Sequence, residues 1–260
     1  MFGTEYNILF AFLTAFLTTY LVIPKIIFFA DKFRLADVPG ERASHERSIP
    51  VFGGIAIFSG IIFSLLFWGK LDNLQFILAS LFIVSFVGVI DDLLGLTPYK
   101  KLIGQIIAIL VVIYLSEIQI SSMHGVLGVH DLPDLIATLF TVFVVVVITN
   151  GINLIDGADG LAGGIGVISS FCFGVVALFT DDYDMAILAF SLMGALLAFL
   201  KYNFPPARLF MGDTGSLLVG MILSVLAINL ISRGLVTEMI HLPNKGPLLA
   251  IVFLAIPLFD

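Results

Sequence analysis

The feature that most constrains this chain is a series of nine stretches that contain no Asp, Glu, Lys, Arg or His. They cover residues 6–24, 51–69, 73–90, 102–116, 135–155, 161–180, 185–200, 214–232 and 246–259. A helix needs about 20 residues to cross the hydrocarbon core of a bilayer, and fewer where the bilayer thins. We therefore expect eight full membrane spans and, in the last and shortest stretch, the start of a ninth.

Composition supports a membrane protein and excludes several other classes. Hydrophobic residues make up 60% of the chain and charged residues 12%, whereas a soluble domain has roughly 45–50% and 25%. Such a chain is neither an ordinary soluble domain nor intrinsically disordered. The net charge of −7 offers no basic surface, so we expect no nucleic-acid partner. The single cysteine, Cys172, excludes a disulfide framework within the chain.

The apolar stretches are predicted to be helices. Backbone polar groups in lipid must find their hydrogen bonds within the same segment, and the stretches lack the alternation of barrel strands. The predicted fold class is therefore all-α, a polytopic membrane helix bundle, with residues 1–260 forming a single integral membrane domain.

The basic residues predict the orientation of the bundle. Nine of the twelve Lys and Arg residues fall in the connections that follow the odd-numbered stretches. The positive-inside rule then places those connections in the cytoplasm and the N-terminus outside. The first basic residue is Lys25, after the first apolar stretch, so this stretch is expected to be a retained helix and not a cleaved signal peptide.

Two adjacent acids mark the first candidate site on the cytoplasmic side. Asp91 and Asp92 directly follow an apolar stretch, which places them at the C-terminal end of a helix. The helix dipole disfavours an anion there by roughly 0.3–1 kcal/mol, and the two carboxylates also repel each other. A metal ion or a lysine, such as Lys100 or Lys101, would relieve both effects. The alternative is a helix end that faces solvent.

A second group of polar residues lies around Asp156. Asp156 and Asp159 are three residues apart, so they share a face if the sixth helix has begun by then, and Asn153 lies one turn earlier. Together with Asp213, they offer oxygen ligands of the kind that Mg²⁺ prefers. The alternative for Asp156 and Asp159 is that they cap a helix N-terminus.

Two further features suit phosphate groups. The even-numbered helices should all begin on the cytoplasmic side, where the free N–H groups of their first turns favour phosphate binding, as at residues 212–216. In the first cytoplasmic connection, His45 is flanked by Arg42 and Arg47. These side chains could bind a phosphate, or His45 could be solvated while the arginines only satisfy the positive-inside rule.

Three motifs follow one another on this side of the membrane. They are Asp91-Asp92 with Lys101, the segment NGINLIDGADG over residues 150–160, and the segment FMGDTGS over residues 210–216. In this order they resemble the polyprenyl-phosphate N-acetylhexosamine-1-phosphate transferase family.

The resemblance implies a reaction. A sugar 1-phosphate would pass from a UDP-N-acetylhexosamine to a polyprenyl phosphate such as undecaprenyl phosphate, releasing UMP, as the first membrane step of cell-envelope polysaccharide synthesis. It also implies Mg²⁺ as cofactor, with Mn²⁺ as a substitute, and an active site on the cytoplasmic face of the cell membrane. Ile155 stands where the muramoyl-pentapeptide branch commonly has threonine, so GlcNAc-1-phosphate is the expected group, as in O-antigen or teichoic-acid synthesis. A homodimer stays open.

The resemblance also implies roles for individual residues. Asn153 and Asp213 would be Mg²⁺ ligands, and Asp91 and Asp92 would assist the acceptor and the metal. Lys101 would hold a phosphate. The remaining residues implied to bind substrate are Arg42, His45, Asn150, Asp156 and Asp159.

Phosphoryl transfer mainly needs alignment and charge neutralisation. The second pKa of a phosphate monoester is near about 6, so the acceptor is ionised at neutral pH. We therefore expect direct in-line attack of the lipid phosphate on the β-phosphorus, with a covalent aspartyl-phosphate route as the alternative.

Family members continue past the position of Asp260 into a His- and Arg-rich loop and further spans, so we expect the C-terminal part of the family fold to be lacking. Two other classes of protein stay open. A transporter or flippase would place its ionisable residues near the bilayer midplane and not at helix ends. A catalytically inactive membrane protein would bind lipid phosphate without releasing UMP.

Overall fold

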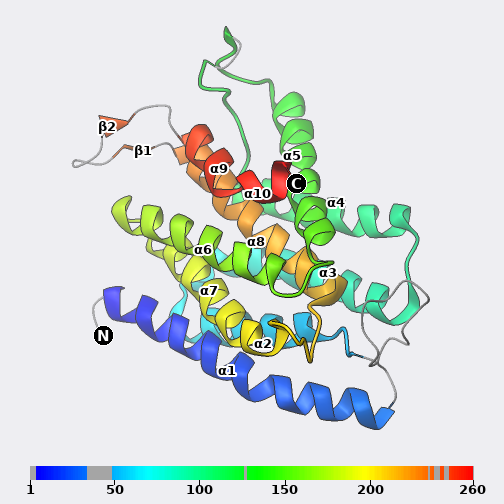
Figure 1. The fold of residues 1–260 in the computed structure, drawn as a ribbon. Coiled ribbons are helices and arrows are strands. Elements are labelled where there is room, and N and C mark those ends of the chain that lie inside the picture. The colour runs from blue at the N-terminus through cyan, green and yellow to red at the C-terminus, as the bar shows by residue number, and fades with distance from the viewer. Residues whose placement is uncertain are drawn as a thin grey trace.

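The computed structural model describes residues 4–33, 49–125, 128–233, 235–236, 241–242 and 246–259, and almost all of them are helical (Figure 1). The eight longer helices are α1 (Thr4–Phe33), α2 (Gly53–Trp68), α3 (Leu71–Leu94), α4 (Pro98–Ser116), α5 (Asp134–Ile155), α6 (Leu161–Phe179), α7 (Tyr183–Asn203) and α8 (Gly212–Arg233). They are followed by a two-residue antiparallel pair, β1 (Leu235–Val236) and β2 (His241–Leu242), and by α9 (Gly246–Phe253) and α10 (Ala255–Phe259). The predicted helical bundle is confirmed.

Seven helices in the described part of the chain are long and apolar enough to cross a membrane, namely α1 and α3 to α8. The second predicted span is α2, which has 16 residues and is shorter than the others. The eighth full span therefore stays a prediction. The last apolar stretch, where a ninth helix was expected to begin, forms the two short helices α9 and α10.

The first helix is longer than its apolar stretch. The sequence suggested an end at Pro24, but α1 continues through this proline to Phe33. A proline leaves the other hydrogen bonds of a helix in place, and the exposed Lys25 and Lys32 can extend their ammonium groups away from apolar surroundings. Both lysines thus lie on the helix and not in a connection.

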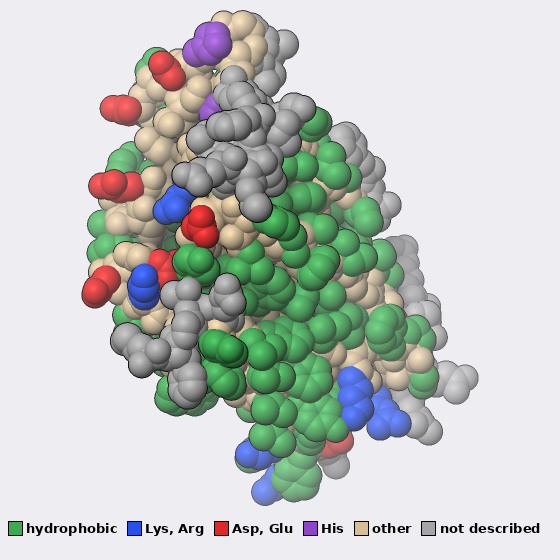
Figure 2. Space-filling view, turned by 90° about the vertical axis from the view of Figure 1, so that its left-hand side faces the viewer, with side chains coloured by type: hydrophobic (Ala, Val, Ile, Leu, Met, Phe, Trp, Pro, Cys, Tyr) green, Lys and Arg blue, Asp and Glu red, His purple; other side chains and the backbone are tan. Residues whose placement is uncertain are grey.

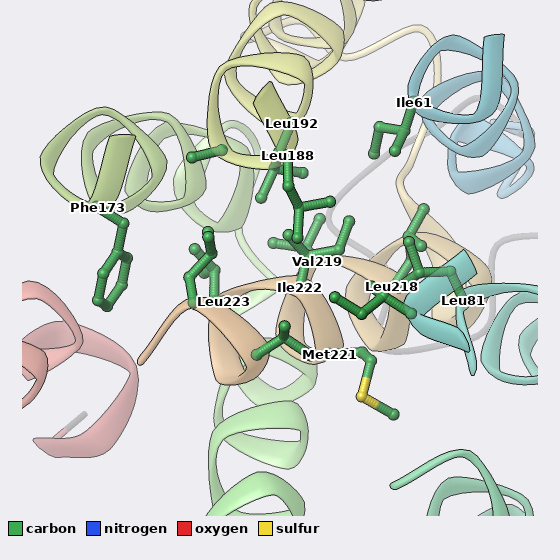
Figure 3. Packing of buried hydrophobic residues seen from close by; sticks show 14 of the residues in the cluster. Ile61, Leu81, Phe173, Leu188, Leu192, Leu218, Val219, Met221, Ile222 and Leu223 are labelled. Carbon is green, nitrogen blue, oxygen red and sulfur yellow. The ribbon is translucent and has the colours of Figure 1, made fainter. Parts of the chain in front are cut away.

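Helix α8 is the centre of the bundle. Every side chain from Thr214 to Ile228 is buried, and α8 contacts α2, α3, α5, α6, α7 and α9. Figure 3 shows Leu218, Met221 and Leu223 extending from α8 in different directions toward the surrounding helices. A helix that is apolar on all sides is stable only when it is enclosed. The neighbouring helices therefore fix the position of both ends of α8.

Two glycines bring neighbouring helices into backbone contact with the start of α8. A Cβ atom on Gly54 of α2 would lie 2.1 Å from the Gly215 nitrogen, and one on Gly88 of α3 would lie 2.4 Å from the Thr214 Cα. Only a residue without a side chain fits at such distances. The first turn of α8 is therefore clamped between α2 and α3.

The outer surface is the kind that faces lipid. Figure 2 shows a broad, continuous face of hydrophobic side chains, with the charged side chains gathered toward its margins. Large exposed hydrophobic side chains include Phe28, Phe63, Phe86 and Leu139. Apolar surfaces of this extent mark contact with a membrane or a partner. With the seven candidate spans of the described part, they make this chain a multi-pass membrane protein.

Candidate active site

Three helix ends meet around an open cavity of about 610 Å³. The end of α3 contributes Asp91 and Asp92, the end of α5 contributes Asn153 and the adjacent Asp156, and the start of α8 contributes Asp213. Half of the ten site residues suggested by the sequence thus line one cavity.

Asp92 holds the first turn of α8. Its Oδ1 accepts a hydrogen bond from the backbone N–H of Asp213 (2.7 Å), and its Oδ2 accepts from the N–H and the hydroxyl of Thr214 (3.0 and 2.5 Å). An anion at a helix N-terminus stabilises the helix. These amides were expected to bind phosphate, and that expectation is wrong for α8, because a carboxylate of α3 already accepts from them.

Asp91 and Asp213 share one lysine. The Lys101 ammonium lies 2.9 Å from Asp91 Oδ2 and also pairs with Asp213 Oδ1. The other oxygen of Asp91 accepts from the backbone N–H of Leu96 at 2.6 Å. The lysine therefore neutralises part of the charge of the site.

A short connection places Lys101 at the site. Helix α3 ends at Gly95, whose φ of 63° is left-handed and whose N–H bonds to the Asp91 carbonyl oxygen (2.8 Å). Helix α4 begins at Pro98. Glycine after a helix end and proline at a helix start are the residues that favour such a turn. The first turn of α4, which carries Lys101, thereby returns to the end of α3.

Asn153 joins α5 to α8. Its Nδ2 donates to Asp213 Oδ1 (2.5 Å) and to Ser216 Oγ (2.7 Å). Asp213 and Ser216 are three residues apart on one face of α8, so one amide group spans a single turn of that helix.

Asp156 is a carboxyl group whose surroundings disfavour its charged form. Burial, together with the negative charges of Asp213 and Asp92, raises the pKa of its carboxyl to about 8, although a hydrogen bond from the Gly212 amide acts in the opposite direction. Among the described residues, no basic side chain forms an ion pair with Asp156. A cation in the cavity would compensate this carboxylate.

Mg²⁺ stays a prediction, and the side chains at the cavity include oxygen donors of the kind it takes. Mg²⁺ typically takes one or two protein carboxylates and completes its coordination with water and substrate phosphates. Within the described ranges, no group of three or more His, Cys, Asp or Glu residues is arranged to hold a metal ion, so water and substrate would have to supply most of the ligands. Asp213 and Asn153 offer one carboxylate and one amide oxygen at the cavity wall.

The helix boundaries correct the expectation for Asp156 and Asp159. Helix α6 begins at Leu161, after the left-handed Gly160, and its N-terminus has no side-chain cap. The two acids therefore do not share the first turn of α6, and neither is its N-cap residue, which is Gly160. Asp156 instead lies directly after α5, near Asn153. Asp159 is half-buried in the turn and is not among the cavity-lining residues.

Of the other expected residues, Asn150 is not brought to this cavity, and two lie outside the described part of the chain. The Asn150 side chain donates to the Val146 carbonyl oxygen of its own helix at 2.7 Å and is not among the lining residues. Arg42 and His45 lie outside the described residues, so their binding of substrate stays a prediction.

The structure adds residues to which sequence reasoning gave no role. Thr214 and Ser216 bind Asp92 and Asn153, and their hydroxyl groups next to Asp213 were the available signal. Val51 and Phe210 line the cavity. Their segments pair through the Phe210 N–H and the Pro50 carbonyl oxygen (2.8 Å), a contact between distant parts of the sequence that no local pattern reveals.

Known proteins share this arrangement of sequence motifs. The sequence model of glycosyl transferase family 4 matches residues 74–231, which include the ends of α3 and α5 and all but the last two residues of α8. This match extends over more than half of the chain.

Individual relatives agree with the family match. The chain is 33% identical over 257 residues to a protein of Bacillus subtilis named probable undecaprenyl-phosphate N-acetylglucosaminyl 1-phosphate transferase, covering 98% of this chain and 70% of the relative. It is 32% identical over 262 residues to the undecaprenyl-phosphate alpha-N-acetylglucosaminyl 1-phosphate transferase of Haemophilus influenzae, with the same coverage.

A third relative comes from the other branch of these enzymes. The phospho-N-acetylmuramoyl-pentapeptide-transferase of Caldicellulosiruptor bescii is 30% identical over 235 residues, covering 85% of this chain and 73% of the relative. The ordered motifs, the membrane helices and these matches agree with one another. This chain is therefore a membrane enzyme that belongs to glycosyl transferase family 4, among the polyprenyl-phosphate N-acetylhexosamine-1-phosphate transferases.

Proposed function

We propose that this protein transfers N-acetylglucosamine 1-phosphate from its UDP derivative to undecaprenyl phosphate or a similar polyprenyl phosphate, with Mg²⁺ as cofactor and UMP as the second product. The reaction would take place on the cytoplasmic face of the cell membrane, as the first membrane step in the synthesis of an envelope polysaccharide. The named activities of the relatives from Bacillus and Haemophilus support this acceptor and this sugar.

One observation carries the proposal. Four carboxylates and one lysine, Asp91, Asp92, Asp156, Asp213 and Lys101, converge at the ends of membrane-spanning helices, and the carboxylates border an open cavity. A lipid phosphate can reach a site at the end of a membrane-spanning helix while its prenyl chain stays in the bilayer. A transporter would need its charged groups near the midplane, so this placement favours an enzyme.

The residues of the cavity suit distinct tasks. Asp213 and Asn153 would hold Mg²⁺, which when bound neutralises the charge of a diphosphate. Asp92 would keep Asp213 in place through the first turn of α8. Lys101 is within reach to exchange Asp213 for a phosphate oxygen. Phe210 offers a ring against which a uracil base could stack.

The transfer step would need little proton movement. An oxygen of the lipid phosphate attacks the β-phosphorus of the UDP-sugar, and the bond from that phosphorus to the bridging oxygen breaks. UMP leaves with the bridging oxygen and the negative charge. Asp92 already accepts three hydrogen bonds, which makes it a poor nucleophile. This favours direct attack over an aspartyl-phosphate formed on that residue.

The proposal is tested with the full chain, purified and placed in lipid nanodiscs. Radiolabelled UDP-N-acetylglucosamine and undecaprenyl phosphate should give labelled lipid and an equal amount of UMP. Removal of Mg²⁺ with a chelator should stop the reaction, and added Mg²⁺ or Mn²⁺ should restore it. Binding of lipid phosphate without UMP release would contradict the proposal and favour an inactive binding protein. Substrate flux across liposomes without transfer would favour a transporter.

Rapid-quench sampling during a single turnover separates the two chemical routes. Direct attack predicts that no phosphorylated protein accumulates before UMP appears. A phosphorylated aspartate trapped on that time scale would overturn direct attack and leave the overall reaction intact.

A further inference from the structure

The hydroxyl group of Ser216 lies in the protein interior, one turn into α8. Ser216 is 0% exposed, and its Oγ accepts a hydrogen bond from Asn153 Nδ2 at 2.7 Å. The same Nδ2 donates to Asp213 Oδ1. Both hydrogens of the Asn153 amide are therefore directed at α8.

The contacts of Ser216 determine which way this amide faces. The Ser216 hydroxyl donates to the backbone carbonyl oxygen of Asp213, 3.5 Å away, which leaves its lone pairs for Asn153. The Asp213 carboxylate also requires a donor, because an ionised carboxylate only accepts. Both neighbours select the amide nitrogen, so the carbonyl oxygen of Asn153 must lie on the side away from them.

That carbonyl oxygen is suited to a cation. Asn153 lines the cavity, and no described residue donates a hydrogen bond to its Oδ1. The same cavity is lined by the carboxyl groups of Asp213 and Asp156, of which Asp156 forms no ion pair with a described basic residue. An amide oxygen without a donor, next to carboxyl groups, suits a hard divalent cation.

We propose that Ser216 is a positioning residue, which holds the Asn153 amide so that its carbonyl oxygen faces a bound divalent cation. This inference rests on the proposed function. The Asn153 NH₂ group has two described acceptors, Asp213 and Ser216. If the oxygens of Asp213 turn to the cation, Ser216 still accepts from this NH₂ group and holds it against α8. Residues that orient metal ligands in this way typically change metal affinity by roughly 10–100-fold when they are replaced.

The test measures binding of Mn²⁺ alone, by the loss of its free paramagnetic resonance signal, with the purified full chain. Ser216→Ala should weaken Mn²⁺ binding about 10-fold, and Ser216→Thr, which keeps a hydroxyl group, should recover most of the affinity. Ser224→Ala is the matched control, because Ser224 is equally buried in α8 but donates to the Gly220 carbonyl oxygen of its own helix. That variant should bind Mn²⁺ like the wild type.

A kinetic readout distinguishes positioning from general damage. In the transfer assay, Ser216→Ala should raise the half-saturating Mg²⁺ concentration by a similar factor and leave the rate at saturating Mg²⁺ much less affected. Unchanged Mn²⁺ affinity in Ser216→Ala, or an equal loss in Ser224→Ala, would overturn the role of Ser216 and leave the proposed function standing. A wild-type protein that neither binds Mn²⁺ nor transfers the sugar phosphate would overturn the proposed function and this inference with it.

Discussion

The two ends of α8, about 33 Å apart along the helix, each lie next to a carboxyl group of another segment, and the two groups differ in their partners. At the C-terminal end of α8, which we call the far end because it lies away from the cavity, Asp182 is 7% exposed and fully paired. It accepts hydrogen bonds from Asn229 Nδ2 (2.8 Å) and from the Met185 N–H (3.4 Å), and it forms an ion pair with Arg233 (2.9 Å). At the N-terminal end of α8, which we call the near end because it borders the cavity, Asp156 has no cationic partner in the described structure and its pKa is raised.

This difference separates a structural carboxylate from a chemical one. A buried charge that serves only stability is paired and hydrogen-bonded, because an unpaired charge destabilises the fold. A site that must accept a cation and phosphates has to leave charge available. We therefore expect substitutions at the near end to change activity more than stability, and substitutions at the far end to do the reverse.

The largest effect is expected for Asp213→Asn at the near end. Loss of this carboxylate removes the charged metal ligand of the proposal, which contributes several kcal/mol to phosphoryl transfer, so transfer should fall by at least about 100-fold. Unfolding temperature in detergent should stay close to that of the wild type. Substantial residual transfer, measured as UMP release, would show that Asp213 is not at the reacting centre.

Gly88→Ala should give the next largest effect. Its Cβ would lie 2.4 Å from the Thr214 Cα, so α8 must move away from Asp92 and the site must distort. Overpacking of this kind costs about 1–3 kcal/mol, and we expect a roughly 10-fold or greater loss of transfer, since small misplacements of reacting groups are costly.

The control for this substitution is Gly164→Ala on α6, where a Cβ would meet no atom within 4 Å. This variant should transfer sugar phosphate at the wild-type rate. Equal losses in both variants would mean that glycine is needed for reasons other than the approach of α3 to α8.

The smallest effect on activity is expected for Asp182→Ala at the far end. The change removes the cap of α7 and leaves Arg233 and Asn229 without their acceptor, so the free energy of unfolding should fall by about 1–3 kcal/mol. Transfer per folded molecule should change less than about twofold. Asp181→Asn, in the same turn but exposed, keeps an acceptor for the Tyr183 hydroxyl and tolerates the left-handed φ of 54°, so it should alter neither quantity. A selective loss of transfer in Asp182→Ala would break the division of roles between the two ends.

The sequence revealed the near end better than the far end, for physical reasons. Asp91, Asp92 and Lys101 are joined by one short turn, and Asp213 sits in a glycine-rich helix start, so local patterns were sufficient. Asp182 resembled any acid of an outer connection, because its partners Asn229 and Arg233 are about 50 residues away.

Helix packing was likewise beyond the sequence. Apolar stretches predicted the helices but could not distinguish the enclosed α8 from the lipid-exposed α1, since membrane interiors and lipid tails are equally apolar. The C-terminal end of α1 was misjudged for a related reason: a charge-free stretch shows where charged residues begin, whereas a helix ends where its backbone hydrogen bonds end. The start of α6 at Leu161, by contrast, coincides with the start of its charge-free stretch.

The enclosure of α8 also bears on how the protein is made. Domains and helices leave the ribosome in chain order, so α1 to α7 enter the membrane before the helix around which they pack. Until residues 212–233 arrive, these helices lack their common neighbour, and Asp92 has no helix start to hold. Synthesis interrupted at any earlier codon thus yields a protein that lacks both its centre and its active site, and partly made copies cannot consume substrate.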